Sequence, residues 1–88
     1  MEYSTLEYII SLVMDKTIYS DDHKYLVEQL KQARSQAGLE QTQVAEMLNK
    51  TQSYVSKIES GQRRIDIKQL KEFAKIYNKN ISYFIKNE

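Results

Sequence analysis

The 88-residue sequence contains no cysteine, proline or tryptophan, only two glycines and a single histidine. The lack of cysteine excludes disulfides and thiolate metal sites, so nothing in the composition points to an oxidising compartment. No apolar run approaches the roughly 18 residues that a membrane-spanning helix requires. The N-terminus also lacks the basic segment, followed by an apolar one, that is typical of a signal peptide. We therefore expect a cytoplasmic protein with no metal site, no cofactor and no membrane association.

Few positions in the chain force the backbone out of a helix, because proline is absent and the glycines occur only at Gly38 and Gly61. Apolar residues recur at three- and four-residue steps, which predicts an all-α fold of short amphipathic helices joined by short turns. The expected helices cover about 21–37, 41–48, 52–60 and 67–77, with a last short turn after Asn80. The residues expected to point inward are Leu26, Leu30, Ala33, Ala37, Val44, Ala45, Leu48, Val55 and Ile58. The expected helix after Asp66 carries Ile67, Leu70, Phe73, Ala74 and Tyr77 on one side, and the last turn bears Ile81, Phe84 and Ile85.

Residues 1–22 form an acidic N-terminal extension, with five acids and one lysine, ahead of a basic domain at 23–88. The spacing of apolar residues predicts an amphipathic helix from about Ser4 to Met14. One interpretation is a surface for dimerisation or for a protein partner, formed by Leu6, Ile9, Ile10, Val13 and Phe84. The alternative is a helix that only caps the core of its own domain.

The segment from Gln41 to Gly61 has the most specific pattern in the sequence. It predicts two short helices across a tight turn, and the outer face of the second helix is polar: Gln52, Ser53, Ser56 and Lys57. Such a helix can enter the DNA major groove, where glutamine pairs with adenine and lysine reaches guanine. The alternative at this point is an ordinary solvated helix face.

From about Leu30 to Phe84 the chain resembles the lambda-repressor/Cro type of helix-turn-helix domain, also called the Xre family. The resemblance lies in Arg34, GLEQTQVAEML (Gly38 to Leu48), TQSYVSKIESGQRR (Thr51 to Arg64) and FAKIYNKNISYFI (Phe73 to Ile85), about 55 of the 88 residues. It implies a five-helix domain, here with an additional N-terminal helix. It also implies a transcriptional regulator, in most cases a repressor, that binds double-stranded operator DNA of near-palindromic sequence as a homodimer.

The resemblance also assigns roles to individual residues. It implies that Gln52, Ser53 and Lys57, with Ser56 beside them, read bases, and that Arg34 and Glu59 form an internal ion pair. Contacts to the DNA backbone are expected from Gln41, Lys50, Thr51, Tyr54, Arg63 and Arg64. The alternative for Tyr54 is that its side chain packs on its own domain. The sequence departs from the family pattern at Glu40, where a serine or threonine commonly caps the helix, and at Lys50, where an aliphatic residue is frequent.

Other classes of function have less support. An enzyme is not expected, because the sequence has no cysteine and no glycine-rich phosphate loop. Its only histidine, His23, stands beside a predicted helix start. We expect His23 to be solvated. The alternative to a simple regulator is an antitoxin-type module that binds a protein partner through its N-terminal segment and also regulates its own operon.

Overall fold

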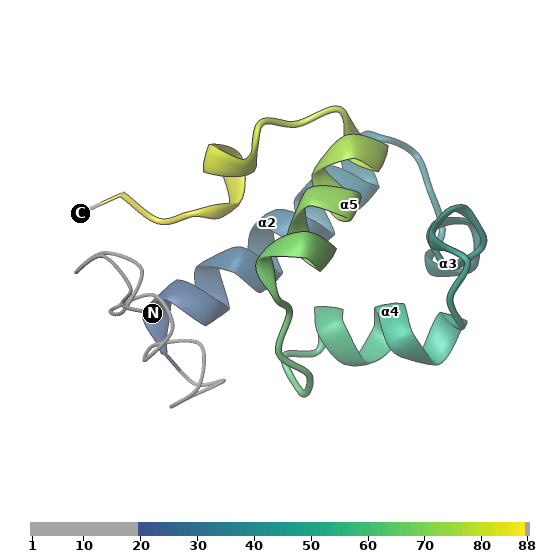
Figure 1. Cartoon of the computed structure of the whole chain (residues 1–88), viewed down its shortest axis with the longest axis horizontal. Coiled ribbons are helices and arrows are strands. Elements are labelled where there is room, and N and C mark those ends of the chain that lie inside the picture. Colours follow the sequence, from purple (N-terminus) through teal and green to yellow (C-terminus); the bar gives the residue numbers. More distant parts are fainter. Residues whose placement is uncertain (1–19, 88) are drawn as a thin grey trace, which may run out of the picture.

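The computed structural model describes residues 20–87 of the chain, and this part is helical throughout with no strand (Figure 1). It contains four α-helices, namely α2 (Asp21–Gln36), α3 (Gln41–Leu48), α4 (Gln52–Glu59) and α5 (Ile67–Tyr77). A 3₁₀-helix, η1 (Ile81–Phe84), follows. The all-α expectation is confirmed, but the fifth element of the domain is a single 3₁₀ turn rather than an α-helix. The N-terminal helix expected from about Ser4 to Met14 lies outside the described residues.

Each helix begins where the sequence offers a capping group. The side-chain oxygens of Ser20, Thr51 and Asp66 accept hydrogen bonds from backbone N–H groups three residues later, at the starts of α2, α4 and α5. These oxygens satisfy donors that an isolated helix leaves unpaired. At α3, which starts after Glu40, Gln43 Oε1 accepts from the Glu40 N–H at 2.7 Å. The cap is therefore made by the third residue of the helix, as in one half of a capping box.

The short turns are formed by residues that tolerate a left-handed backbone. Asn49 ends α3 with φ 57° and Asn78 ends α5 with φ 54°. Asparagine adopts this region more readily than most residues, so both helices can stop sharply. At Asn49 the stop leaves only a short turn before Thr51 caps α4, and α3 packs directly against α4. Figure 1 shows this pair at one side of the molecule, with α4 along its edge.

One hydrophobic core joins the helices. Helix α2 contacts α4, α5 and η1, and α5 contacts α3 and η1. The buried cluster consists of Leu26, Leu30, Ala33, Val44, Ala45, Tyr54, Val55, Ile58, Ile65, Leu70, Phe73, Ala74, Tyr77 and Phe84. A core that draws on every described element fixes α4 to the rest of the domain.

Some expected core positions are wrong. Ala37 is exposed because α2 ends at Gln36 and Ala37 is its C-cap. Ile67, the first residue of α5, is 42% exposed, and Ile85, the residue after η1, is 48% exposed. Ile65 is buried although it lies in the connection before α5, where helical spacing gives no signal.

Two further expectations need correction. Phe84 was expected at a dimer or partner surface, but it is 1% exposed and belongs to the core of its own domain. His23 was expected to be solvated, but it is 8% exposed, with its imidazole beside Gly61. Leu6, Ile9, Ile10 and Val13 lie outside the described residues. Within residues 20–87, no helix has both the length and the apolar character needed to cross a bilayer.

Candidate nucleic-acid interface

Helix α4 has two chemically different faces. Tyr54, Val55, Ile58 and Glu59 are buried against the domain, and this face fixes the helix in place. On the opposite face Gln52, Ser53 and Lys57 are exposed and Ser56 is half-buried. The helix therefore holds a row of polar side chains on a rigid base, as a groove-reading helix requires.

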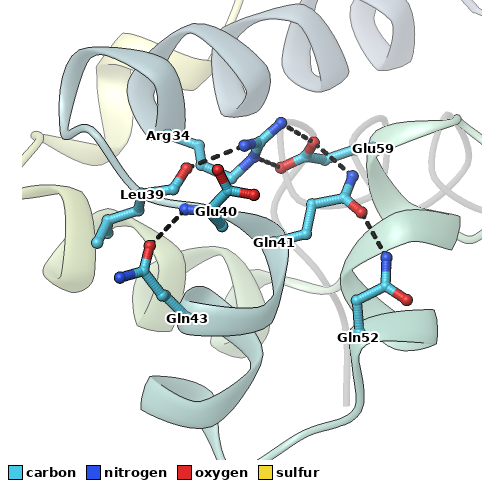
Figure 2. A network of polar contacts seen from close by, with 7 residues as sticks. All are labelled: Arg34, Leu39, Glu40, Gln41, Gln43, Gln52 and Glu59. Carbon is cyan, nitrogen blue, oxygen red and sulfur yellow. Dashed lines mark hydrogen bonds and ion pairs between the residues drawn. The ribbon is translucent and has the colours of Figure 1, made fainter.

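A buried ion pair anchors the C-terminal end of α4. Glu59 is only 4% exposed, and its carboxylate accepts hydrogen bonds from Arg34 Nε at 2.8 Å and Arg34 Nη2 at 3.1 Å (Figure 2). Arg34 Nη1 also donates to the Leu39 carbonyl at 3.0 Å. The hydrogen bond with Glu59 raises the pKa of Arg34 above its ordinary value. Both charges are thus hydrogen-bonded, which a buried pair requires if it is not to destabilise the fold.

The same network continues to the outer face. Gln41 Nε2 donates to Glu59 Oε1 at 3.1 Å, and Gln52 Nε2 donates to Gln41 Oε1 at 2.7 Å. Figure 2 shows Gln41 between Glu59 and Gln52, joined to each by a hydrogen bond. The first residue of α3 is therefore tied to the first residue of α4 and to the buried ion pair.

Two cations lie over the ring of Tyr54. Lys50 Nζ is 5.3 Å and Arg63 Cζ 4.8 Å from the ring centroid. Tyr54 itself is 8% exposed and stacks on Phe73, so the residue expected to contact the DNA backbone lies mostly in the core. Burial raises the pKa of Tyr54, and the charge of Arg63 partly opposes this rise. The ring positions the two cations by cation–π attraction.

Beside this ring is an open cleft of about 550 Å³. Its lining includes Lys50, Lys57 and Arg63 together with the hydroxyl residues Thr51 and Ser53, and it contains no carboxylate. The N-terminal end of α4 lies at this cleft, because its N-cap Thr51 is part of the lining. The positive end of the helix dipole favours negative charge there. The cleft can therefore accept an anionic group such as a backbone phosphate.

The comparisons with known proteins agree with this geometry. A family model for the helix-turn-helix domain matches residues 30–84, more than half of the chain. The chain belongs to the Xre/lambda-repressor-type helix-turn-helix family. A search of curated proteins found no match. Family membership identifies a DNA-binding domain of the kind found in transcription regulators, with α3 and α4 as its helix-turn-helix.

In this helix-turn-helix domain one cleft brings together five of the residues that the sequence singled out, namely Lys50, Thr51, Ser53, Lys57 and Arg63. Gln52, Ser53, Lys57, Lys50, Arg63 and Arg64 are exposed, and Gln41 is half-buried between α3 and α4. Thr51 is exposed, but its hydroxyl oxygen is used as the cap of α4. Arg34 and Glu59, expected to pair, form the ion pair described above.

Sequence reasoning missed two features of the site. One is the hydrogen bond from Gln41 to Glu59, which extends the ion pair to the outer face. The only feature of the sequence that pointed to this network is the glutamine at the first position of both α3 and α4. The other is the shared ring contact of Lys50 and Arg63 on Tyr54. These cations are 13 positions apart, and no spacing rule brings them together.

Proposed function

We propose that this protein is a sequence-specific transcriptional regulator that binds double-stranded DNA as a homodimer and represses transcription. The observation that carries the proposal is the exposed row of Gln52, Ser53 and Lys57 on a helix whose other face is buried. Amide, hydroxyl and ammonium groups are the side chains that hydrogen-bond to base edges. Their rigid support and their place in a helix-turn-helix domain make base reading the best-supported use of this face.

In this proposal α4 enters the major groove, with its N-terminal residues closest to the bases. Lys50 and Arg63, which share the cleft beside Tyr54, then contact phosphates, and so does Arg64. Phosphate contacts position the protein and supply affinity that is independent of sequence, whereas the polar row supplies the discrimination.

A homodimer doubles this arrangement. Two copies of α4 related by a two-fold axis would reach successive major grooves roughly 34 Å apart. The operator would then be near-palindromic, because each protomer reads one half-site. Binding of such a dimer over a promoter would exclude RNA polymerase, and the result would be repression.

A selection from random DNA duplexes, run at a fixed salt concentration, tests the proposal. We expect enrichment of one half-site repeated with inverted symmetry, with the two centres 10 to 10.5 base pairs apart or a multiple of this spacing. Transcription in vitro from a promoter that carries the selected site should fall as protein is added. Enrichment of no sequence would overturn sequence-specific binding. A single half-site without symmetry would overturn the homodimer, and unchanged or increased transcription would overturn repression.

A further inference from the structure

Three cations share the cleft beside Tyr54, and no acidic residue accompanies them. Lys50 precedes α4, Lys57 lies on it and Arg63 follows it, and all three line the cleft. In the part of the chain that the structure describes, none of them forms an ion pair and no carboxylate lines the cleft. The fold thus holds three like charges close together, and these repel one another until an anion enters.

Two of these cations are fixed in position without loss of their charge. Lys50 Nζ and Arg63 Cζ lie over the Tyr54 ring, at 5.3 and 4.8 Å from its centroid. That ring is buried and stacks on Phe73, so it is itself held in place. A cation–π contact orients a cation but does not neutralise it. The two charges are therefore preorganised, which reduces the entropy lost when a ligand binds.

The remaining polar side chains of the cleft can all donate hydrogen bonds. Thr51 Oγ1 accepts from the Tyr54 N–H, which leaves its own hydroxyl proton available. The hydroxyl of Ser53 and the side-chain amide of Asn49 also line the cleft, and neither has a hydrogen-bond partner within residues 20–87. Phosphate oxygens are strong acceptors. The cleft therefore combines positive charge with donors, which is the complement of a phosphate group.

The concentration of charge in the cleft favours a free diphosphate over a stretch of DNA backbone. Each DNA phosphate carries a single charge and is spaced along the strand, whereas a terminal phosphate carries about −1.5 to −2 at neutral pH. A diphosphate gathers this charge and that of its neighbour in one small group, which three cations in one cleft can contact together.

The size and lining of the cleft agree with a small ligand. Its volume of about 550 Å³ lies within the range of small-molecule pockets, roughly 300–1,000 Å³. Tyr54, the aromatic residue of the lining, is only 8% exposed and offers no open ring face on which a base could stack. Recognition in this cleft therefore depends on the phosphates and not on a base.

We propose that this cleft binds the diphosphate group of a free small molecule, such as pyrophosphate or a nucleoside diphosphate, and that the bound ligand competes with DNA. The competition rests on the proposed function, because it requires Lys50 and Arg63 to contact DNA phosphates as well. The binding of diphosphate does not depend on it. Such competition makes operator occupancy depend on the concentration of a small anion as well as on that of the protein.

The first test uses pyrophosphate alone, without DNA or divalent cations. Backbone amide ¹H–¹⁵N shifts of the full chain are followed while pyrophosphate replaces chloride at constant ionic strength. We expect saturable shifts at Lys50, Ser53 and Arg63. Inorganic phosphate should bind about fivefold more weakly or less tightly still, because it reaches fewer cations at once and one such contact at 4 Å in water is worth about this factor. Shifts that do not saturate, or that are equally large at lysines over the whole surface, would overturn the proposal.

Variants that remove one charge locate the site. Lys50→Gln and Arg63→Gln should each weaken pyrophosphate binding about fivefold. The matched control is Lys75→Gln, which removes the same charge from an exposed lysine on α5 outside the cleft and should leave the affinity nearly unchanged. All three residues are exposed, and circular dichroism checks that each variant is folded. Equal weakening by the three changes would show general attraction to a basic domain and would overturn the site.

The second test measures competition on the selected operator. Pyrophosphate is added to the protein–DNA complex and is compared with KCl and potassium sulfate at equal ionic strength. We expect pyrophosphate at its own dissociation constant to lower the apparent DNA affinity about twofold beyond the effect of the other salts, which act by screening. The same effect of all salts would show that the cleft contacts only the DNA backbone, and would overturn the competition. A chain that selects no DNA sequence would overturn the proposed function instead, while the titration without DNA would still decide whether the cleft binds diphosphate.

Discussion

At the scale of single residues, polar side chains divide between the core and the face that we propose contacts DNA, according to whether a partner is available. This face, called here the DNA-facing side, carries Lys50, Gln52, Ser53, Lys57 and Arg63. Glu59 is buried because Arg34 and Gln41 satisfy its carboxylate. Lys57, in contrast, is exposed on the other face of the same helix. Burial of an unpaired ammonium would cost several kcal/mol, whereas an exposed one remains available to a ligand.

Replacement of Lys57 tests base reading by a single side chain. We expect Lys57→Ala to weaken binding to the preferred site by about 1–3 kcal/mol and to relax discrimination at one base position. The reason is that, in the proposed function, Lys57 donates to base acceptors rather than to phosphate. Affinity for the selected site and for random DNA is measured in parallel at one salt concentration. Equal weakening of both would show that Lys57 contacts phosphate only.

Tyr77 gives a prediction about stability in alkali. Burial is the main cause that raises the pKa of its hydroxyl above the ordinary value of 10.0, and the nearby Glu59 acts in the same direction. Folding therefore favours the protonated hydroxyl. Its contribution to the free energy of unfolding is full below about pH 10 and decreases above that pH, because the unfolded chain loses the proton first. We expect the free energy of unfolding to fall above pH 10 more steeply for the unchanged protein than for Tyr77→Phe. The difference between the two should change by about 1 kcal/mol by pH 11.

Urea unfolding at several pH values measures this difference. The hydroxyl of Tyr77 is buried and has no hydrogen-bond partner within residues 20–87, so Tyr77→Phe should differ from the unchanged protein by no more than about 1 kcal/mol at pH 7. A difference that is the same at pH 7 and pH 11 would show that the hydroxyl titrates alike in the folded and unfolded chains.

The burial of some single residues could not be predicted from the sequence. Tyr54 and His23 stand in polar surroundings along the chain, yet both are 8% exposed. Their burial depends on contacts with Phe73 and with the turn at Gly61, which are distant in sequence. Local pattern cannot report such contacts, and both side chains are of the amphipathic kind that is found inside and outside.

At the scale of elements, prediction was much more successful. The bounds of α3 and α5 agree with the expected ranges, because the caps and the asparagines that end the helices are local signals. The end of α4 was less predictable, because α4 stops at Glu59, one residue earlier than expected. The short turn expected after Asn80 is confirmed as the 3₁₀-helix η1. The turn between α3 and α4 depends on local residues, so the helix-turn-helix could be inferred before its contacts were known.

The cap of α5 can be tested without affecting the DNA-facing side. Asp66 accepts from the Gln69 N–H at 2.7 Å, and Gln69 Oε1 accepts from the Asp66 N–H at 3.0 Å. We expect Asp66→Ala to lower the free energy of unfolding by about 0.5–2 kcal/mol, because the Gln69 N–H at the helix terminus loses its partner. Urea unfolding provides the measurement. Lys68→Ala, an exposed change in the same helix, is the control and should stay within about 0.5 kcal/mol of the unchanged protein. Equal effects of the two changes would contradict a role for the cap.

At the scale of the whole molecule, the net charge of +1 combines two opposite parts. Residues 1–22 carry a net charge of −4, and residues 23–88 carry +5. Within 50–64 there are four cations and one acid, and that acid is the buried Glu59. The electrostatic field at the DNA-facing side is therefore more positive than the total suggests, which is the relevant quantity for a polyanionic partner.

The extension itself can be tested by deletion. Because Ser20 caps α2, removal of residues 1–19 leaves the first described helix intact, which removal of 1–22 would not. If the apolar residues of the extension mediate dimerisation, the deletion should convert dimer to monomer in sedimentation and weaken operator binding. The full-length double variant Glu2→Gln, Glu7→Gln controls for charge, since it removes two acids and keeps the apolar residues. Unchanged sedimentation and unchanged operator affinity after deletion would exclude the extension as the dimer contact.

The salt dependence of binding distinguishes one protomer on DNA from two. Each phosphate contact by a cation releases counterions and adds about 0.9 to the negative slope of log affinity against log salt concentration. With Lys50, Arg63 and Arg64 on phosphates, one protomer on a half-site should give a slope of about −3, and a dimer on the full operator about −5. Fluorescence anisotropy between 50 and 300 mM KCl measures both slopes, one on a duplex too short for more than one half-site and the other on a duplex that carries the full operator. Arg64→Ala should flatten the slope by about one unit on the half-site and by about two on the operator. Equal slopes on the two duplexes would mean that only one protomer contacts phosphates, because a second protomer cannot bind DNA without releasing counterions of its own.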